Sequence, residues 1–145
     1  MTCCFLGHKE TPSSVYEKLE EAVEKVIVED GVSSFLVGNQ GQFDSMALSA
    51  LRKLKIKHPH ISYNVVLAYM PVEKEMWSPY EYGETMLPGG IESVHPRYAV
   101  SWRNKWMVNE SDMVICYITH GWGGAAKYVE LAEKKGKRVT NLRDL

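Results

Sequence analysis

The sequence contains no apolar run that approaches the ~18 residues of a membrane-spanning helix, so we predict no such helix. It also lacks an excess of either charge, because 17 basic and 18 acidic side chains leave a formal net charge of −1. Phosphate backbones and anionic membranes attract an excess of positive charge, so this balance argues against a nucleic-acid partner and against a membrane partner. The start, MTCCFLGHKE, lacks the basic lead and long apolar core of a signal peptide, and we expect a cytoplasmic protein.

Cysteine is scarce in this sequence, and its three copies follow no recognisable pattern. Cys3, Cys4 and Cys116 are odd in number and lack metal-ligand spacing, which argues against a disulfide framework and against a zinc site. His8 and His120 have no third metal ligand at a suitable spacing, so the sequence predicts neither a metal nor a cofactor. The G-x-G-x-x-G fingerprint and a Gly-Lys-Ser/Thr loop are missing too, which argues against a nucleoside triphosphatase.

Segments with strand character alternate with segments of helical character along the chain. Short apolar runs that resemble strands cover residues 2–6, 34–37, 63–69, 113–118 and 138–142. Most of these runs are separated by segments whose apolar residues recur with the period of an amphipathic helix. This alternation predicts a single domain over residues 1–145 with a Rossmann-like, doubly wound α/β fold. We expect a mostly parallel sheet of about five strands with helices on both faces.

Residues 70–95 interrupt the alternation. They mix prolines, glycines, aromatic residues and carboxylates without a sustained period. A connection of this length inside a compact domain is usually functional or carries minor structure of its own. We therefore predict an irregular, lid-like insertion, whose part from Trp77 to Tyr82 either covers the ligand site or forms half of a homodimer contact.

The helix predicted to begin at Pro96 carries two neighbouring stripes of large side chains. Tyr98, Trp102 and Trp106 are four residues apart, and the stripe beside them contains Arg103. Four-residue spacing keeps side chains on one face of a helix, so we expect the aromatic stripe to pack against the domain.

Glycine-rich loops follow three of the predicted strands. In doubly wound sheets a ligand binds beyond the carboxyl ends of the strands, where the strand order reverses, so the loops after the first and fourth strands should face each other. Gly123 and Gly124 open a helix whose unpaired N–H groups attract phosphate or carboxylate. We predict a phosphate-bearing ligand here, although a tight turn that binds nothing also fits. The candidate ligand-binding residues are Gly7, His8, Lys9, Gly38, Asn39, Gln40, Gly41, Asp44, His120, Gly121, Trp122, Gly123 and Gly124.

Several of these side chains have two possible roles. Lys9 contacts phosphate or is an ordinary exposed lysine, and His8 and His120 suit hydrogen bonding or proton transfer. Asp44 is either a helix cap or an acceptor for a ribose hydroxyl, because a carboxylate serves both. Trp122 either stacks on a base or fills the space against the neighbouring helix.

The chain also resembles a known group of proteins, from its first loop to its last helix. Gly7-His8-Lys9, the loop from Gly38 to Asp44, and RNKWMVNESDMVICYITHGWGGAAKYVE from Arg103 to Glu130 resemble the SLOG superfamily. This Rossmann-like group contains the YpsA-like, DprA and Lonely Guy proteins, and the YpsA-like branch is the most similar. That resemblance implies binding of a nucleotide or nucleotide derivative, possibly ADP-ribose-like, by a sensor or regulatory protein.

Two other members of the group imply different functions. Lonely Guy enzymes cleave the N-glycosidic bond of nucleoside monophosphates, and their catalytic arginine and glutamate fall on Arg103 and Glu130. Trp122, Ala126 and Lys127 replace a proline, a glycine and a threonine of their motif, which weakens the case for this phosphoribohydrolase activity. Resemblance to DprA implies binding of single-stranded DNA, against which the near-neutral charge argues.

Overall fold

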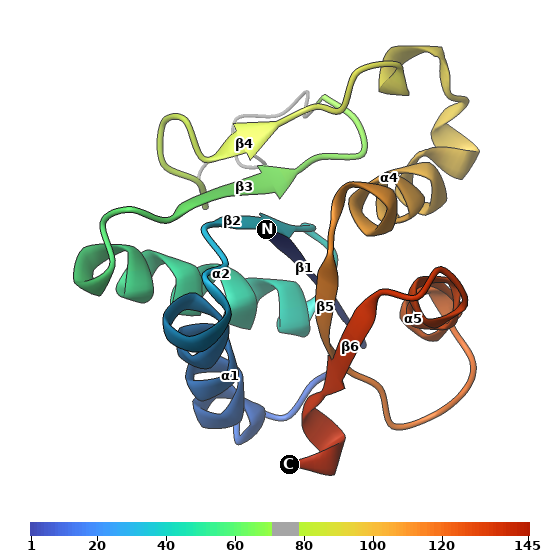
Figure 1. Cartoon of the computed structure of the whole chain (residues 1–145). Helices are drawn as coiled ribbons and strands as arrows, with labels where there is room; N and C mark the ends of the chain where they lie inside the picture. Colours follow the sequence, from blue (N-terminus) through green and yellow to red (C-terminus); the bar gives the residue numbers. More distant parts are fainter. Residues whose placement is uncertain (71–78) are drawn as a thin grey trace.

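The computed structural model describes residues 1–70 and 79–145 of the chain (Figure 1). Strands and helices alternate along most of its length, as the sequence predicts. The elements in chain order are β1 (Thr2–Gly7), α1 (Val15–Asp30), β2 (Ser34–Val37), α2 (Gln42–Lys57), β3 (Ser62–Val66), β4 (Thr85–Met86), the 3-10 turn η1 (Ile91–Ser93), α4 (Pro96–Glu110), β5 (Met113–Tyr117), α5 (Gly124–Lys134), β6 (Arg138–Asn141) and η2 (Leu142–Asp144).

Within the described residues the sheet has six strands in the order β4-β3-β2-β1-β5-β6. Every neighbouring pair is parallel, with Cys3 beside Phe35 of β2 and beside Met113 of β5. The chain moves outward from β1 to β4 and then returns to the other side of β1, so the strand order reverses between β1 and β5. The predicted doubly wound α/β fold is therefore confirmed, and its point of reversal is where the sequence places it.

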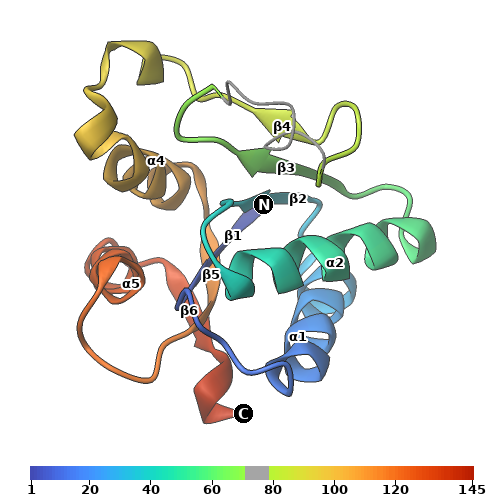
Figure 2. The same cartoon turned by 180° about the vertical axis from the view of Figure 1, so that it is seen from behind.

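Helices cover both faces of the sheet (Figures 1 and 2). Cys3 and Phe5 of β1 point into a core shared with α1 and α2, while Cys4 and Leu6 point into a second core shared with α4 and α5. Side chains of a strand alternate between its two faces, so a central strand covered on both sides is apolar throughout. This explains why β1 and β5 are continuous apolar runs. None of the described helices is long and apolar enough to cross a membrane.

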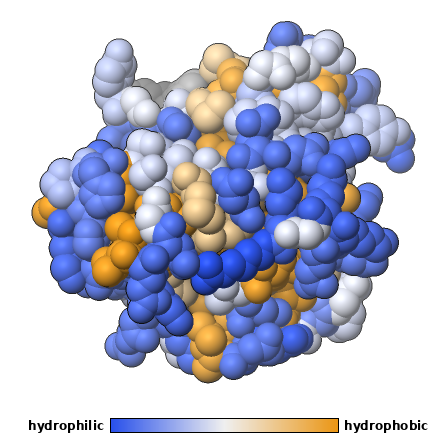
Figure 3. All heavy atoms as spheres, in the orientation of Figure 1, coloured by the Kyte–Doolittle hydropathy of each residue, from blue (hydrophilic) through white to orange (hydrophobic). Residues whose placement is uncertain are grey.

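The insertion adds a sixth strand to the five predicted from the sequence. β4 has only two residues, Thr85 and Met86, and pairs with Val65 and Val66 of β3 at the edge of the sheet. Two residues carry no detectable alternation, which explains why the sequence shows an irregular segment here. The expected lid or dimer contact from Trp77 lies partly outside the described residues. The face shown in Figure 3 is mainly polar, with apolar side chains in small groups, and homodimer formation stays a prediction.

The aromatic stripe of α4 packs against the domain only in part. Tyr98 is 59% exposed, whereas Trp102 and Trp106 are half-buried and Trp106 packs against the second core. The neighbouring stripe, which contains Arg103 and Met107, is the face that is buried. Both stripes have the same helical period, so the period alone does not say which one meets the sheet. Ala99, at 2% exposure, belongs to the same buried stripe.

Candidate functional site

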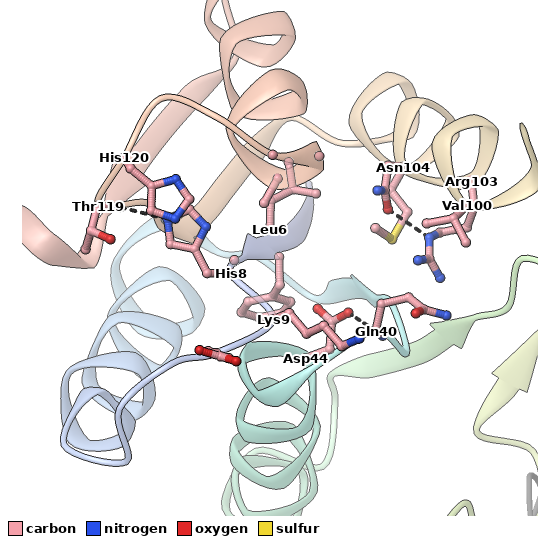
Figure 4. A pocket seen from close by; sticks show the side chains of 17 residues that line it. Leu6, His8, Lys9, Gln40, Asp44, Val100, Arg103, Asn104, Thr119 and His120 are labelled. Carbon is pink, nitrogen blue, oxygen red and sulfur yellow. Dashed lines mark hydrogen bonds between the residues drawn. The ribbon is translucent and has the colours of Figure 1, made fainter.

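A cavity of about 590 Å³ lies at the carboxyl ends of the strands, where the strand order reverses. Its walls come from the loops after β1, β2 and β5, from the start of α5 and from one face of α4 (Figure 4). Nine of the residues singled out in the sequence line it: Gly7, His8, Lys9, Gln40, Asp44, Arg103, His120, Gly123 and Gly124.

The loops after β1 and β5 meet directly at one end of this cavity. The backbone N–H of Thr119 donates a hydrogen bond of 2.9 Å to Nε2 of His8, and the rings of His8 and His120 stack with centroids 3.8 Å apart. Because Nε2 accepts this bond, the neutral His8 ring carries its proton on Nδ1. Burial, together with the nearby His120, lowers the pKa of His8 below 6.5. The expectation that these two loops face each other is confirmed.

Trp122 extends the ring stack out of the cavity mouth. Its indole lies 3.7 Å, centroid to centroid, from His120, and the side chain is 71% exposed. The indole is therefore not a plug against α4, and its exposure leaves ring surface accessible to a ligand. Gly121 precedes it in an exposed turn, and neither residue is among those that line the cavity.

The first turn of α5 presents backbone N–H groups to the cavity. Gly123, Gly124 and Ala125 line it, and no described side chain caps the start of this helix. Gly123 has φ 97°, in the left-handed region that favours glycine. A Cβ built on Gly123 or Gly124 would meet no described atom within 4 Å. An anion can therefore approach these N–H groups without steric hindrance.

Arg103 is buried beside the cavity, with 1% of its surface exposed. Its Nε donates to Oδ1 of Asn104 at 2.8 Å, and its Nη1 donates to Oδ1 of Asn39 at 3.0 Å and to the carbonyl of Val66 at 2.7 Å. Burial lowers the pKa of Arg103, and the negative charge of Asp44 opposes that shift. The guanidinium thus ties α4 to the loop after β2 and to the end of β3, and it places positive charge in the cavity wall.

Asp44 receives its position from the loop that precedes α2. Its Oδ2 accepts a hydrogen bond of 2.9 Å from the backbone N–H of Gln40, and the carboxyl lies against Gly38. A Cβ on Gly38 would lie 2.9 Å from that oxygen and 3.1 Å from Cζ of Arg103, so a larger residue would push both groups apart. Burial raises the pKa of Asp44 to about 6, although the Gln40 bond and Arg103 oppose the rise.

Two more glycines let the loops pack closely together. A Cβ on Gly7 would overlap the ring of Phe43, and a Cβ on Gly41, where φ is 99°, would lie 2.5 Å from Cα of Lys9. The N–H of Gln42 also donates to the carbonyl of Lys9 at 2.8 Å. The loop after β2 therefore supports the cavity wall through residues that do not themselves line the cavity, namely Gly38, Asn39 and Gly41. The Lys9 side chain is exposed at the rim of the cavity.

Glu130 lies away from the cavity. Its side chain is 66% exposed on the surface of α5 and forms an ion pair of 3.1 Å with Lys134, one turn further along. Glu130 is not among the lining residues, whereas Arg103 is. The structure therefore does not bring together the two residues that the resemblance to Lonely Guy enzymes pairs for catalysis.

Apart from Arg103, the cavity face of α4 was not predicted from the sequence. Val100, Arg103, Asn104 and Met107 line the cavity with the spacing i, i+3, i+4, i+7 of one helical face. That period was visible in the sequence, but the stronger aromatic stripe beside it masked the signal. Thr11 was also overlooked; its Oγ1 donates to the carbonyl of His8 at 2.8 Å and holds the first loop in place. In the part of the chain that is described, no three His, Cys, Asp or Glu residues form a metal site.

Comparison with known proteins identifies solved structures that share this fold. No protein-family model matches the chain, and no curated protein matches it. DNA processing protein A (DprA) from Streptococcus pneumoniae superimposes with a TM-score of 0.72 at 15% identity, over 95% of this chain and 48% of that protein. The fold is DprA-like. DNA processing protein A from Helicobacter pylori also matches, with a TM-score of 0.60 at 15% identity, over 96% of this chain and 63% of that one.

These matches bear on two of the expectations from the sequence. This chain spans less than two thirds of either DprA protein, and the likeness concerns the fold. The Helicobacter protein is described as having a single-stranded DNA binding mode, so the argument against a nucleic-acid partner from net charge is wrong. Net charge averages over the whole surface, while a strand contacts only a local patch. The particular similarity to the YpsA-like branch stays a prediction.

Proposed function

We propose that residues 1–145 form one SLOG-type nucleotide-binding domain, related to the YpsA-like branch, with a sensing or regulatory role. Its ligand is a nucleotide or a nucleotide derivative such as an ADP-ribose-like molecule, bound in the cavity at the carboxyl ends of the strands. One observation carries the proposal: a single cavity joins the uncapped start of α5 to the buried guanidinium of Arg103. Phosphate is the ligand group that suits both.

In this proposal each wall of the cavity has its own part in binding. The N–H groups at Gly123 and Gly124 hold a phosphate, and the exposed amine of Lys9 at the rim adds positive charge. The exposed indole of Trp122 stacks on the base outside the cavity mouth. A cavity of about 590 Å³ falls within the range of small-molecule and cofactor sites.

Gly124→Asp tests the position of the phosphate. The new carboxylate repels phosphate from the N–H groups of α5, yet an acidic residue in the first turn of a helix is stabilising, so the fold is preserved. We expect the wild type to gain thermal stability with a nucleotide from a panel of nucleoside mono- and diphosphates and ADP-ribose, and the variant to gain none. Gly89→Asp is the matched control, because Gly89 is exposed, has open space around it and does not line the cavity. A Gly124→Asp variant that still binds with wild-type affinity would contradict the proposed phosphate position.

Single-stranded DNA is the second candidate ligand, and the DprA-like fold favours it. Two features at or beside the cavity suit a strand: the exposed indole of Trp122, on which bases can stack, and the exposed amine of Lys9. Stacking of one base on an aromatic side chain contributes about 1–3 kcal/mol. In this case the phosphate on α5 belongs to the DNA backbone.

Fluorescence anisotropy with a labelled oligo-dT separates the two ligands. Binding of a strand weakens steeply with salt, because each neutralised phosphate releases counterions, whereas one bound mononucleotide gives a shallow dependence. If DNA is the ligand, Trp122→Ala should weaken oligo-dT binding by about tenfold or more. Tyr82→Ala is the control, since Tyr82 is fully exposed and does not line the cavity. The DNA candidate fails if oligo-dT does not bind at low salt.

A further inference from the structure

We infer that Asp44 and Asn104 recognise the two vicinal hydroxyls of a ribose, so that the cavity selects a ribonucleotide over a deoxyribonucleotide. This inference rests on the proposed function, because it assumes that a phosphate occupies the start of α5. Figure 4 shows His120 and Thr119 at one end of the cavity and Arg103, Asn104 and Asp44 toward the other. A ligand with its phosphate on α5 extends a sugar toward this polar end; in an ADP-ribose-like ligand the other sugar, on the far side of the diphosphate, carries the base that stacks on Trp122.

The carboxyl of Asp44 has one oxygen available for a ligand. Oδ2 accepts the hydrogen bond from the Gln40 N–H and lies against Gly38, and these two contacts fix the orientation of the carboxyl group. Oδ1 makes no hydrogen bond to any of the described residues, and Asp44 lines the cavity. An ionised carboxylate only accepts hydrogen bonds, so this oxygen requires a donor from the ligand.

The amide of Asn104 has the complementary property. Its Oδ1 accepts the 2.8 Å bond from Nε of Arg103, and a guanidinium only donates, so this bond identifies the oxygen of the amide. The remaining group, the NH₂ of Asn104, makes no hydrogen bond within the described part of the chain, and Asn104 also lines the cavity. This NH₂ requires an acceptor from the ligand.

Arg103 holds the pair in position. It binds the oxygen of Asn104, and its positive charge favours the ionised form of Asp44. In the view of Figure 4, Asn104 lies above the Arg103 guanidinium and Asp44 below it, both toward the centre of the picture. The cavity therefore offers one fixed acceptor and one fixed donor, and orienting them for a ligand requires no rearrangement of side chains.

A ribose diol satisfies both groups at once. Each hydroxyl can donate and accept, so one donates to Oδ1 of Asp44 while the other accepts from the NH₂ of Asn104. A 2′-deoxyribose offers a single hydroxyl and leaves one of these polar groups without a partner. A site built to bind a hydroxyl discriminates strongly against the analogue that lacks it, because the desolvated protein group is then unpaired.

Matched sugar phosphates test the inference without any contribution from a base. We would titrate ribose 5-phosphate against 2-deoxyribose 5-phosphate, then AMP against 2′-deoxy-AMP and 3′-deoxy-AMP, and finally oligo-dT. The wild type should prefer each ribose compound over its deoxy counterpart by about tenfold or more. Equal or tighter binding of the deoxy compounds, or binding of oligo-dT alone, overturns the inference.

Two substitutions remove the hydrogen-bonding groups one at a time. Asp44→Leu and Asn104→Leu keep side chains of similar size but offer the ligand neither an acceptor nor a donor. Each should reduce the ribose preference to less than about threefold, because one hydroxyl then lacks a partner. Asp44→Asn is the control, because a hydroxyl can accept from the new NH₂ as well as donate to the carboxylate, so the ribose preference should remain. If the pair instead reads the edge of a base, whose donors and acceptors are fixed, Asp44→Asn loses binding and the inference fails.

Gly124→Asp separates failure of this inference from failure of the proposed function. If it abolishes binding while ribose and deoxyribose compounds bind the wild type equally, the phosphate site stands and the sugar site is refuted. If no sugar phosphate, nucleotide or oligo-dT binds the wild type, the proposed function and the inference both fall. The wild-type titrations decide between these outcomes even if a variant folds poorly.

Discussion

The imidazole rings of His8 and His120 lie face to face, with centroids 3.8 Å apart, and so join the loop after β1 to the loop after β5. These loops are more than a hundred residues apart in the chain. Trp122 continues the stack outward, and the N–H of Thr119 holds His8 from the side. The contact lines one end of the cavity and positions the start of α5 beside the end of β1.

The stacked histidines should make stability depend on pH. Because burial and His120 lower the pKa of His8, the folded state holds fewer protons than the unfolded state near pH 6.5. The stabilisation is therefore present above pH 6.5 and is lost as the pH falls below it. His120→Phe keeps an aromatic ring in the stack but removes one charge, so we expect a shallower loss of stability between pH 7 and pH 5. Chemical denaturation at several pH values measures this.

His60→Gln serves as the control for the stacked histidines. His60 is exposed, and its removal should leave the pH dependence of the wild type unchanged. If His120→Phe and the wild type lose stability equally on acidification, the stack does not contribute to the pH dependence.

Gly38→Ala should disturb the polar end of the cavity. The added Cβ would lie 2.9 Å from Oδ2 of Asp44 and 3.1 Å from Cζ of Arg103, so both groups must move. We expect a loss of about 1–3 kcal/mol in the free energy of unfolding, as for other substitutions that overpack a core, and weaker nucleotide binding. Gly89→Ala, where a Cβ meets no described atom within 4 Å, should change neither. A Gly38→Ala variant with wild-type stability would show that this region is loosely packed.

Glu84 should anchor the insertion to the sheet. It is 5% exposed, and its carboxylate accepts from Arg52 at 2.6 and 2.8 Å and from the hydroxyl of Tyr63 at 2.6 Å. The hydrogen bonds from Arg52 outweigh burial and lower the pKa of Glu84 from 4.5 to about 2. Glu84 therefore stabilises the fold above pH 4.5, and this contribution is lost as the pH falls toward 2.

Glu84→Gln tests this contribution. A shift of this size corresponds to about 3 kcal/mol, so we expect a loss of up to that amount at pH 7 and less than half of that difference from the wild type at pH 3. Denaturant midpoints at the two pH values measure it. Glu81→Gln is the neighbouring control, because the Glu81 side chain is exposed. A constant difference between Glu84→Gln and the wild type across this range would exclude ionisation as the cause.

Glu130 provides a test of the phosphoribohydrolase alternative. The exposed ion pair with Lys134 lies outside the cavity, so we expect Glu130→Ala to leave nucleotide affinity unchanged and to lower stability by less than about 0.5 kcal/mol. Chromatography of nucleoside monophosphates incubated with the protein detects free base. Release of base by the wild type that disappears in Glu130→Ala would establish the hydrolase and would require Glu130 to reach the substrate in another conformation.

Much of the fold follows from short-range patterns in the sequence. The apolar run of β1 predicts a buried strand, and the structure agrees, although the strand continues through Gly7, where the sequence predicts a turn. Other features do not follow from such patterns. β4 has only two residues, which is too few to show a period. Tyr98 is exposed although it belongs to a stripe with helical spacing, so the spacing alone does not identify the buried face of α4. The three glycine loops of the site were recognisable because each follows a strand. The cavity face of α4, with Asn104, was not singled out, because a stronger aromatic stripe runs beside it.

The sequence by itself determined the order of strands and helices, and so it determined that the loops after β1 and β5 share one edge of the sheet. The reason is local, because strand alternation and helical period depend on residues that are neighbours in the chain. The right-handedness of connections between parallel strands then decides which face of the sheet each helix covers. Only the tertiary structure decided that Arg103 turns inward and Glu130 outward. A buried guanidinium is stable only with acceptors around it, and those of Arg103 come from Asn39 and Val66 as well as from α4. Partners so distant in the chain meet only after the sheet has formed.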